Sequence, residues 1–144
     1  MRLFAVRHFL ILVFLLGACS CAKAPQAANP YFEMPPEHLL ISERKLFSLA
    51  LQQKRNNKLK SSIGLWTRFL ENNPRSFRGY NNLGMVYYAN GQFSLALSTF
   101  ETGLDLEPFD KKIKDNLKRT LRFQVTLLRE NKDYDAAIQS LKRI

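Results

Sequence analysis

The clearest structural signal in the chain is residues 77–110, which read FRGYNNLGMVYYANGQFSLALSTFETGLDLEPFD. Apolar residues recur in this stretch at spacings of three and four, which is the period of an amphipathic helix. Asn90-Gly91 interrupts the pattern and Glu107-Pro108 ends it. Because Gly and Asn suit the left-handed residue that ends a helix, and Pro cannot continue one, these residues predict two helices joined by a short turn.

The pattern repeats along the chain at an interval of 34 residues, which separates Pro74 from Pro108 and Trp66 from Phe100. That interval is the period of the tetratricopeptide repeat (TPR), a helical hairpin that stacks on its neighbours. Residues 77–110 resemble this repeat at Tyr80, Leu83, Gly84, Tyr87, Ala96, Phe100 and Pro108. The resemblance implies that Gly84 and Ala96 let two helices cross closely, while the larger side chains fill the space between hairpins.

Two less regular copies flank this repeat, at residues 43–76 and 111–144. In the third copy, Phe93 and Tyr134 are 41 residues apart instead of 34. Because seven extra residues make about two helical turns, we expect a long first helix in this copy, roughly over residues 112–130.

The repeats predict the architecture of residues 37–144. We expect an all-α domain of about three TPR hairpins, stacked as a short right-handed α-solenoid. The sequence stops within the last predicted helix and shows no polar capping helix. Ile138, Leu141 and Ile144 are therefore expected to be partly exposed.

Residues 1–18 have the anatomy of a secretory signal peptide. Arg2 and Arg7 supply the positive charge, and residues 9–16 form an apolar run of eight residues. A helix that spans a membrane needs about 20 apolar residues, so this run predicts a signal rather than a transmembrane anchor.

The sequence Leu16-Gly17-Ala18-Cys19 resembles a bacterial lipobox. The resemblance implies that the peptide before Cys19 is removed and that the Cys19 thiol carries a diacylglyceryl lipid, the one covalent group expected. Two or three acyl chains hold a protein stably on a membrane. The expected location is therefore the bacterial cell envelope, with the outer membrane favoured in a Gram-negative organism.

Residues 19–36 are rich in Pro and Ala and predict a flexible tether between the lipid and the helices. Tyr31, Phe32 and Met34 are apolar residues within it. Two interpretations stay open for them: docking on the folded domain, which we favour, and recognition by a partner.

The TPR resemblance also implies a ligand site, because the first helix of each hairpin lines a concave groove in that family. Carried over by position, the groove residues are Arg78, Asn81, Met85 and Tyr88, with Arg119 and Arg122 from the third repeat. The first repeat would add Arg44, Phe47, Leu51, Lys54 and Arg55.

Charge is strongly segregated along the domain. Residues 44–78 hold nine basic residues and one acidic residue, a net +8, whereas residues 79–110 hold four acidic residues and no basic one. Residues 111–129 hold seven basic residues and one acidic residue, a net +6. Such runs form either solvated faces or a basic groove that attracts an acidic partner. Export and the acidic middle repeat argue against nucleic acid.

The sequence shows no set of residues arranged for catalysis or for metal binding. His38 is the one histidine after the predicted signal, and a lone histidine near a helix start suits a surface or capping role. Cys19 and Cys21 have no neighbouring ligands that could complete a metal site. We therefore predict no enzyme, no metal and no small-molecule substrate.

The function expected from these features is a lipid-anchored TPR scaffold that binds another envelope protein, one with an acidic segment. Among lipoproteins it resembles, such scaffolds act in the assembly of envelope, pilus or secretion complexes. Two alternatives stay open. One is a structural subunit that completes a complex through its uncapped C-terminal end, and the other is a soluble periplasmic chaperone-like binder.

Overall fold

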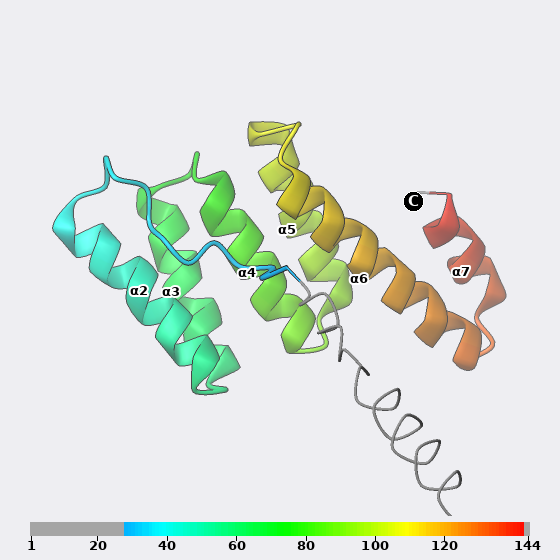
Figure 1. Ribbon diagram of the computed structural model, residues 1–144. Helices are drawn as coiled ribbons and strands as arrows, with labels where there is room; N and C mark the ends of the chain where they lie inside the picture. Colours follow the sequence, from blue (N-terminus) through cyan, green and yellow to red (C-terminus); the bar gives the residue numbers. More distant parts are fainter. Residues whose placement is uncertain (1–27, 143–144) are drawn as a thin grey trace, which may run out of the picture.

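The computed structural model describes residues 28–142, which form six α-helices and no strand (Figure 1). The helices are α2 (Ile41–Arg55), α3 (Leu59–Asn72), α4 (Phe77–Ala89), α5 (Phe93–Leu106), α6 (Lys111–Glu130) and α7 (Tyr134–Leu141). They pair as three antiparallel hairpins, α2 with α3, α4 with α5 and α6 with α7. The predicted all-α stack of TPR-like hairpins is confirmed. The predicted signal peptide and Cys19 lie outside the described residues.

Each hairpin turns through one residue in the left-handed region. These residues are Asn57 (φ 57°), Gly91 (φ 76°) and Lys132 (φ 63°). In every case the preceding residue is an asparagine that caps the first helix of the pair. Helix α6 has 20 residues against 13 in α4, as the longer spacing in the third copy predicted.

The core of the first hairpin is aromatic. The ring centroid of Phe47 lies 4.7 Å from that of Trp66 and 5.4 Å from that of Phe69, all in edge-to-face contact. All three side chains are fully buried. Phe47 was expected in the groove, and that prediction is wrong, because the ring fills the space between α2 and α3.

Glycines mark the closest helix contacts of the stack. A Cβ atom on Gly84 would stand 2.6 Å from Cε1 of Phe100, so the α4–α5 crossing needs the missing side chain. A Cβ atom on Gly79 would stand 2.8 Å from Cδ2 of Leu70, at the contact between α3 and α4. The predicted reason for Gly84 is confirmed, and the contact shows Phe100 packed within its own hairpin.

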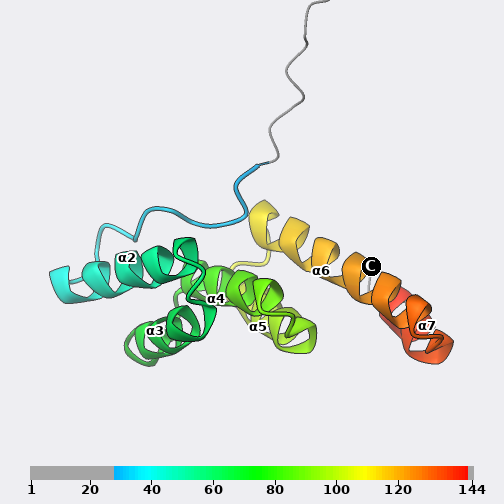
Figure 2. The same cartoon turned by 90° about the horizontal axis from the view of Figure 1, so that it is seen from below.

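The hairpins form two layers. Figure 2 shows α2, α4 and α6 on the side of the extended N-terminal segment, with α3 and α5 behind them. Ile138 and Leu141 of α7 are each 52% exposed, as expected, while Ile144 lies outside the described residues. Within residues 28–142, no helix has both the length and the apolar character to cross a membrane.

Candidate peptide-binding groove

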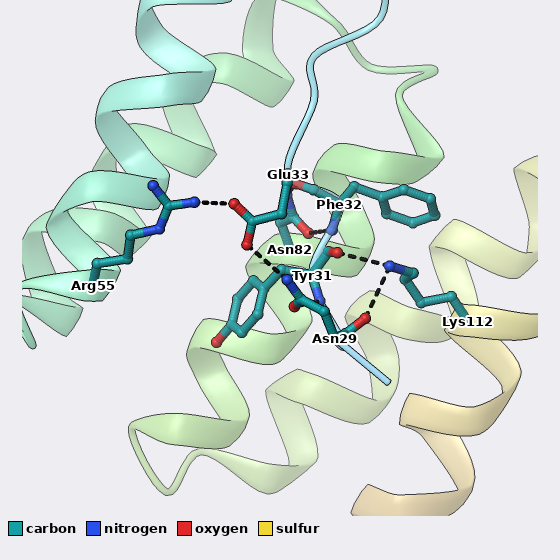
Figure 3. Close-up of polar contacts among 7 residues, drawn as sticks. All are labelled: Asn29, Tyr31, Phe32, Glu33, Arg55, Asn82 and Lys112. Carbon is teal, nitrogen blue, oxygen red and sulfur yellow. Dashed lines mark hydrogen bonds and ion pairs between the residues drawn. The ribbon is translucent and has the colours of Figure 1, made fainter. Parts of the chain in front are cut away.

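Residues 29–34, which we call the N-terminal segment, lie in extended conformation across the face formed by α2, α4 and α6 (Figures 2 and 3). The segment belongs to the C-terminal half of the predicted tether. It contacts Lys112 on α6, then Asn82 on α4, then Arg55 on α2. The face on which the groove was predicted is therefore covered in part by the chain's own residues.

Three buried asparagines bind the backbone of the segment. The Phe32 N–H donates to Asn82 Oδ1 at 2.8 Å, and Asn82 Nδ2 donates back to the Phe32 carbonyl at 2.8 Å. Asn81 Nδ2 and Asn116 Nδ2 both donate to the Pro30 carbonyl at 2.9 Å. Because these bonds use backbone groups, they recognise an extended chain whatever its side chains.

The three amides also bind one another. Asn116 Nδ2 donates to Asn81 Oδ1 at 2.8 Å, and Asn81 Nδ2 donates to Asn82 Oδ1 at 3.2 Å. Their side chains are at most 1% exposed beneath the segment. A buried amide that lacks a partner costs roughly 1–3 kcal/mol, so the network favours a groove that holds a chain.

Lys112 fixes the end of the segment nearest α6. Its Nζ donates to the carbonyl oxygens of Asn29 at 2.9 Å and Tyr31 at 2.7 Å (Figure 3). The same ammonium stands 4.8 Å from the centre of the Phe32 ring. A cation held over an aromatic face adds about 0.5–1 kcal/mol at a partly exposed site.

Tyr31 is the best-buried side chain of the segment, at 5% exposure. Its ring lies under Lys54 of α2, with Nζ 4.2 Å from the centroid, and its hydroxyl donates to the Met85 carbonyl at 3.3 Å. Burial, helped by the negative charge of Glu33, raises the pKa of the Tyr31 phenol well above its ordinary value. The groove therefore accepts this residue in its neutral form.

Phe32 and Glu33 use the opposite walls of the groove. The Phe32 ring packs edge-on against Phe77, with centroids 5.7 Å apart, and Arg78 stands 5.4 Å from its centre. The Glu33 carboxylate pairs with the Arg55 guanidinium. That pair is 40% and 61% exposed, so it guides orientation and contributes at most about 1 kcal/mol.

Part of the groove is not covered by the segment. A cleft of about 970 Å³ lies between Glu33–Pro35 and the exposed side of α2. Its lining includes the apolar side chains of Met34, Ile41 and Leu49 and the basic side chains of Arg44, Lys45 and Arg55. The segment cannot fill this cleft, because the chain turns at Pro36–Leu39 to enter α2.

The predicted groove residues fall into three groups. Arg78, Asn81 and Met85 contact the segment through the ring and hydrogen-bond contacts already described. Tyr88 belongs instead to an aromatic cluster, 5.6 Å from Phe93 and 5.8 Å from Phe123 between centroids. Arg119 and Arg122 are exposed on α6, beyond the part of the helix that the segment contacts.

Three residues that bind the segment were not predicted from the sequence, namely Asn82, Lys112 and Asn116. One signal could have found two of them, because Asn82 and Asn116 occupy equivalent positions, 34 residues apart, in successive repeats. A polar residue kept at one repeat position on the groove side indicates a ladder that binds a backbone. Lys112 gives no such signal, since it is one of several lysines at the start of α6.

Comparison with protein families supports the prediction of a tetratricopeptide repeat. The model of the family described as tetratricopeptide repeat matches residues 65–98, which cover the second half of α3, all of α4 and the beginning of α5. A comparison with curated proteins finds no match. TPR proteins are generally non-catalytic scaffolds that bind protein partners. The matched repeat and the six helices together show that the described chain is a TPR-like stack of helical hairpins.

Proposed function

We propose that this protein is a lipid-anchored TPR scaffold of the bacterial cell envelope, whose groove holds an extended segment of a partner protein. The observation that carries the proposal is the asparagine network, in which Asn81, Asn82 and Asn116 bind the backbone of an extended chain. Backbone recognition of this kind is how many domains capture peptide partners. A partner role in assembling an envelope, pilus or secretion complex fits such a scaffold.

The proposed lipid on Cys19 sets an upper limit on the distance between the groove and the membrane. Asn29 follows Cys19 by ten positions, and an extended chain spans at most about 3.3–3.6 Å per residue. The Asn29 end of the segment therefore lies within roughly 35 Å of the anchor. A scaffold held in this way meets partners at the membrane surface.

The charge of α6 favours a partner with an acidic segment. Residues 111–129 carry a net +6, and the exposed residues Arg119 and Arg122 extend this charge beyond Lys112. A planar guanidinium with several donors suits carboxylates. Such rim charges act mainly on the rate of association and on its dependence on salt.

A photo-reactive phenylalanine analogue at Phe123 tests the proposal in cells. Phe123 is 41% exposed beside Tyr88, and Thr67 on α3 supplies an exposed control position on the opposite layer. We expect a crosslinked envelope protein from position 123 and none from position 67, with a lower yield in the double variant Arg119→Ala and Arg122→Ala. Equal yields from both positions, or a yield that the double variant leaves unchanged, contradict the proposal.

One observation favours a second function, in which the chain is a structural subunit. Tyr134, Ile138 and Leu141 are spaced for one face of α7 and are 58%, 52% and 52% exposed. Changing Ile138 and Leu141 together to Ser separates the two functions. Loss of partner crosslinking from position 123 in that variant assigns the interaction to α7 instead of the groove.

A further inference from the structure

The N-terminal segment occupies the groove in the way a bound peptide does. It reaches all three first helices, it is held through its backbone, and two of its side chains are partly or fully buried. A partner that uses the same asparagines must remove it. This competition rests on the proposed function, since it matters only where the groove binds another chain.

We propose that residues 29–34 are a built-in competitor for the groove, and that the partner carries an extended segment of the same pattern that continues into the cleft beside α2. The pattern is a proline, two aromatic residues and an acid, as in Pro30, Tyr31, Phe32 and Glu33. The continuation contains apolar and acidic residues.

The first part of the pattern follows from the contacts of the segment. The Tyr31 site offers a buried ring position and the Met85 carbonyl as acceptor. The Phe32 site offers the Phe77 ring edge and two cations, and an acid beside Arg55 completes the match. A partner with the same three side chains makes the same contacts in the same direction.

The continuation follows from the cleft that the segment leaves open. Ile41 is 74% exposed and Leu49 42%, so apolar surface of α2 lies uncovered at the position where a longer peptide would run. Arg44 and Lys45 flank this surface with positive charge. The segment must turn back to join α2, whereas a separate chain can continue straight on.

This difference determines how a partner can displace the segment from the groove. The residues between Met34 and α2 are few, so the segment competes at a high effective concentration, on the order of millimolar. A partner with only the same contacts binds poorly against it, and its apparent affinity falls with the fraction of open grooves. Contacts in the cleft are available to the partner alone, so they raise its affinity and compensate for the competition.

Fluorescent peptides and the full chain in detergent micelles test this inference. The first probe is ANPYFEMPP, the sequence of residues 28–36. The second is ANPYFELDIE, which continues with apolar and acidic residues, and the third, ANPSSEMPP, lacks the aromatic pair. The proteins are the wild type, a released variant with Tyr31→Ser and Phe32→Ser, and Phe109→Ser as a matched control, because Phe109 is an aromatic residue that is 85% exposed outside the groove.

We expect the released variant to bind ANPYFEMPP at least about tenfold more tightly than the wild type, and Phe109→Ser to bind it like the wild type. ANPYFELDIE should bind the wild type more tightly than ANPYFEMPP does, and Arg44→Ala should remove that gain. The single variant Phe32→Ser, which leaves Tyr31 in place, repeats the comparison with a smaller change to the packing.

Each of the following outcomes contradicts one part of the inference. Equal affinity of the wild type and both released variants for ANPYFEMPP shows that the segment does not compete. Equal affinity for ANPYFEMPP and ANPYFELDIE refutes the continuation into the cleft. If the released variants bind ANPYFEMPP and ANPSSEMPP equally well, the groove does not read this pattern, while its recognition of a peptide backbone stands. If the released variants bind neither peptide, the proposed function is contradicted as well.

Discussion

Asn82 holds Phe32 at both of its backbone groups, with Oδ1 and Nδ2 each 2.8 Å from the atom they bind. The two residues lie 50 positions apart in the sequence, and Figure 3 shows the amide facing the peptide backbone across the groove. A planar amide that pairs with the N–H and C=O of one residue imitates the edge of a β-strand. This pairing fixes the register of the segment against α4.

The first prediction concerns the amide network at Asn116. Its Nδ2 donates to both Pro30 and Asn81, so Asn116→Asp places a carboxylate against two carbonyl oxygens. An unpaired buried group costs about 1–3 kcal/mol, and more when charged. We expect chymotryptic cleavage after Tyr31 or Phe32 to accelerate by about tenfold or more, because cleavage tracks the open population. Asn72→Asp, exposed on α3, is the control and should cleave at the wild-type rate.

A second prediction tests the packing of the middle hairpin. Gly84→Ala puts a methyl group 2.6 Å from the nearest carbon of the buried Phe100 ring, and overpacking of this kind costs roughly 1–3 kcal/mol. Gly64 on α3 is the matched control, because a Cβ atom there meets nothing within 4 Å. Gly64→Ala should stabilise the domain by about 0.5–1 kcal/mol. Urea unfolding midpoints that move in the same direction for both variants contradict this packing.

A third prediction follows from Tyr31. Its pKa is higher in the docked segment than in the free chain, where a tyrosine titrates near 10. The buried phenol therefore contributes fully to the free energy of docking below about pH 10. This contribution is lost progressively as the pH rises above that value. The absorbance titration of the wild type, minus that of Tyr31→Phe, should show one tyrosine that ionises later than the ordinary midpoint. A difference curve centred at the ordinary midpoint shows that the phenol is not buried.

A fourth prediction concerns the proposed anchor. Cys19→Ala removes the thiol that would carry the lipid, so the protein should leave the membrane fraction or accumulate as a larger precursor. Cys21→Ala, two residues away, is the matched control and should fractionate like the wild type. Wild-type fractionation and gel mobility of Cys19→Ala argue that the chain is not held by a lipid on this residue.

The helices could be predicted from local signals. Asn90-Gly91 and the prolines at positions 74 and 108 mark helix ends through backbone preferences that need no tertiary information. The extra length of α6 followed from a change in the repeat interval. Phe47 was misplaced because an apolar residue on the first helix of a hairpin can face either the groove or its partner helix, and only the Trp66 contact decides between them.

The occupied groove was beyond prediction for a different reason. Tyr31 and Phe32 lie in a stretch without periodicity. Phe32 pairs with the Asn82 amide 50 residues later in the chain, and the Tyr31 hydroxyl donates to the Met85 carbonyl 54 residues later. A single asparagine on a helix does not show whether its side chain is solvated or binds a backbone, and the 34-residue spacing of Asn82 and Asn116 was the one signal that favoured backbone binding. The positions of Asn81 and Arg78 followed from the resemblance to the TPR family, but the ligand beside them did not.

Amide hydrogen exchange at Phe32 tests the central claim, that the groove binds an extended chain through Asn82. The Phe32 N–H lies outside any helix or sheet, and Asn82 Oδ1 is the acceptor the structure gives it. We expect its exchange to be slowed by about tenfold or more relative to a free peptide of residues 28–36, which corresponds to about 1.4 kcal/mol of docking. In Asn82→Ala this protection should disappear while the amides of α4 stay protected. A Phe32 amide that exchanges in the wild type as fast as in the free peptide contradicts the account.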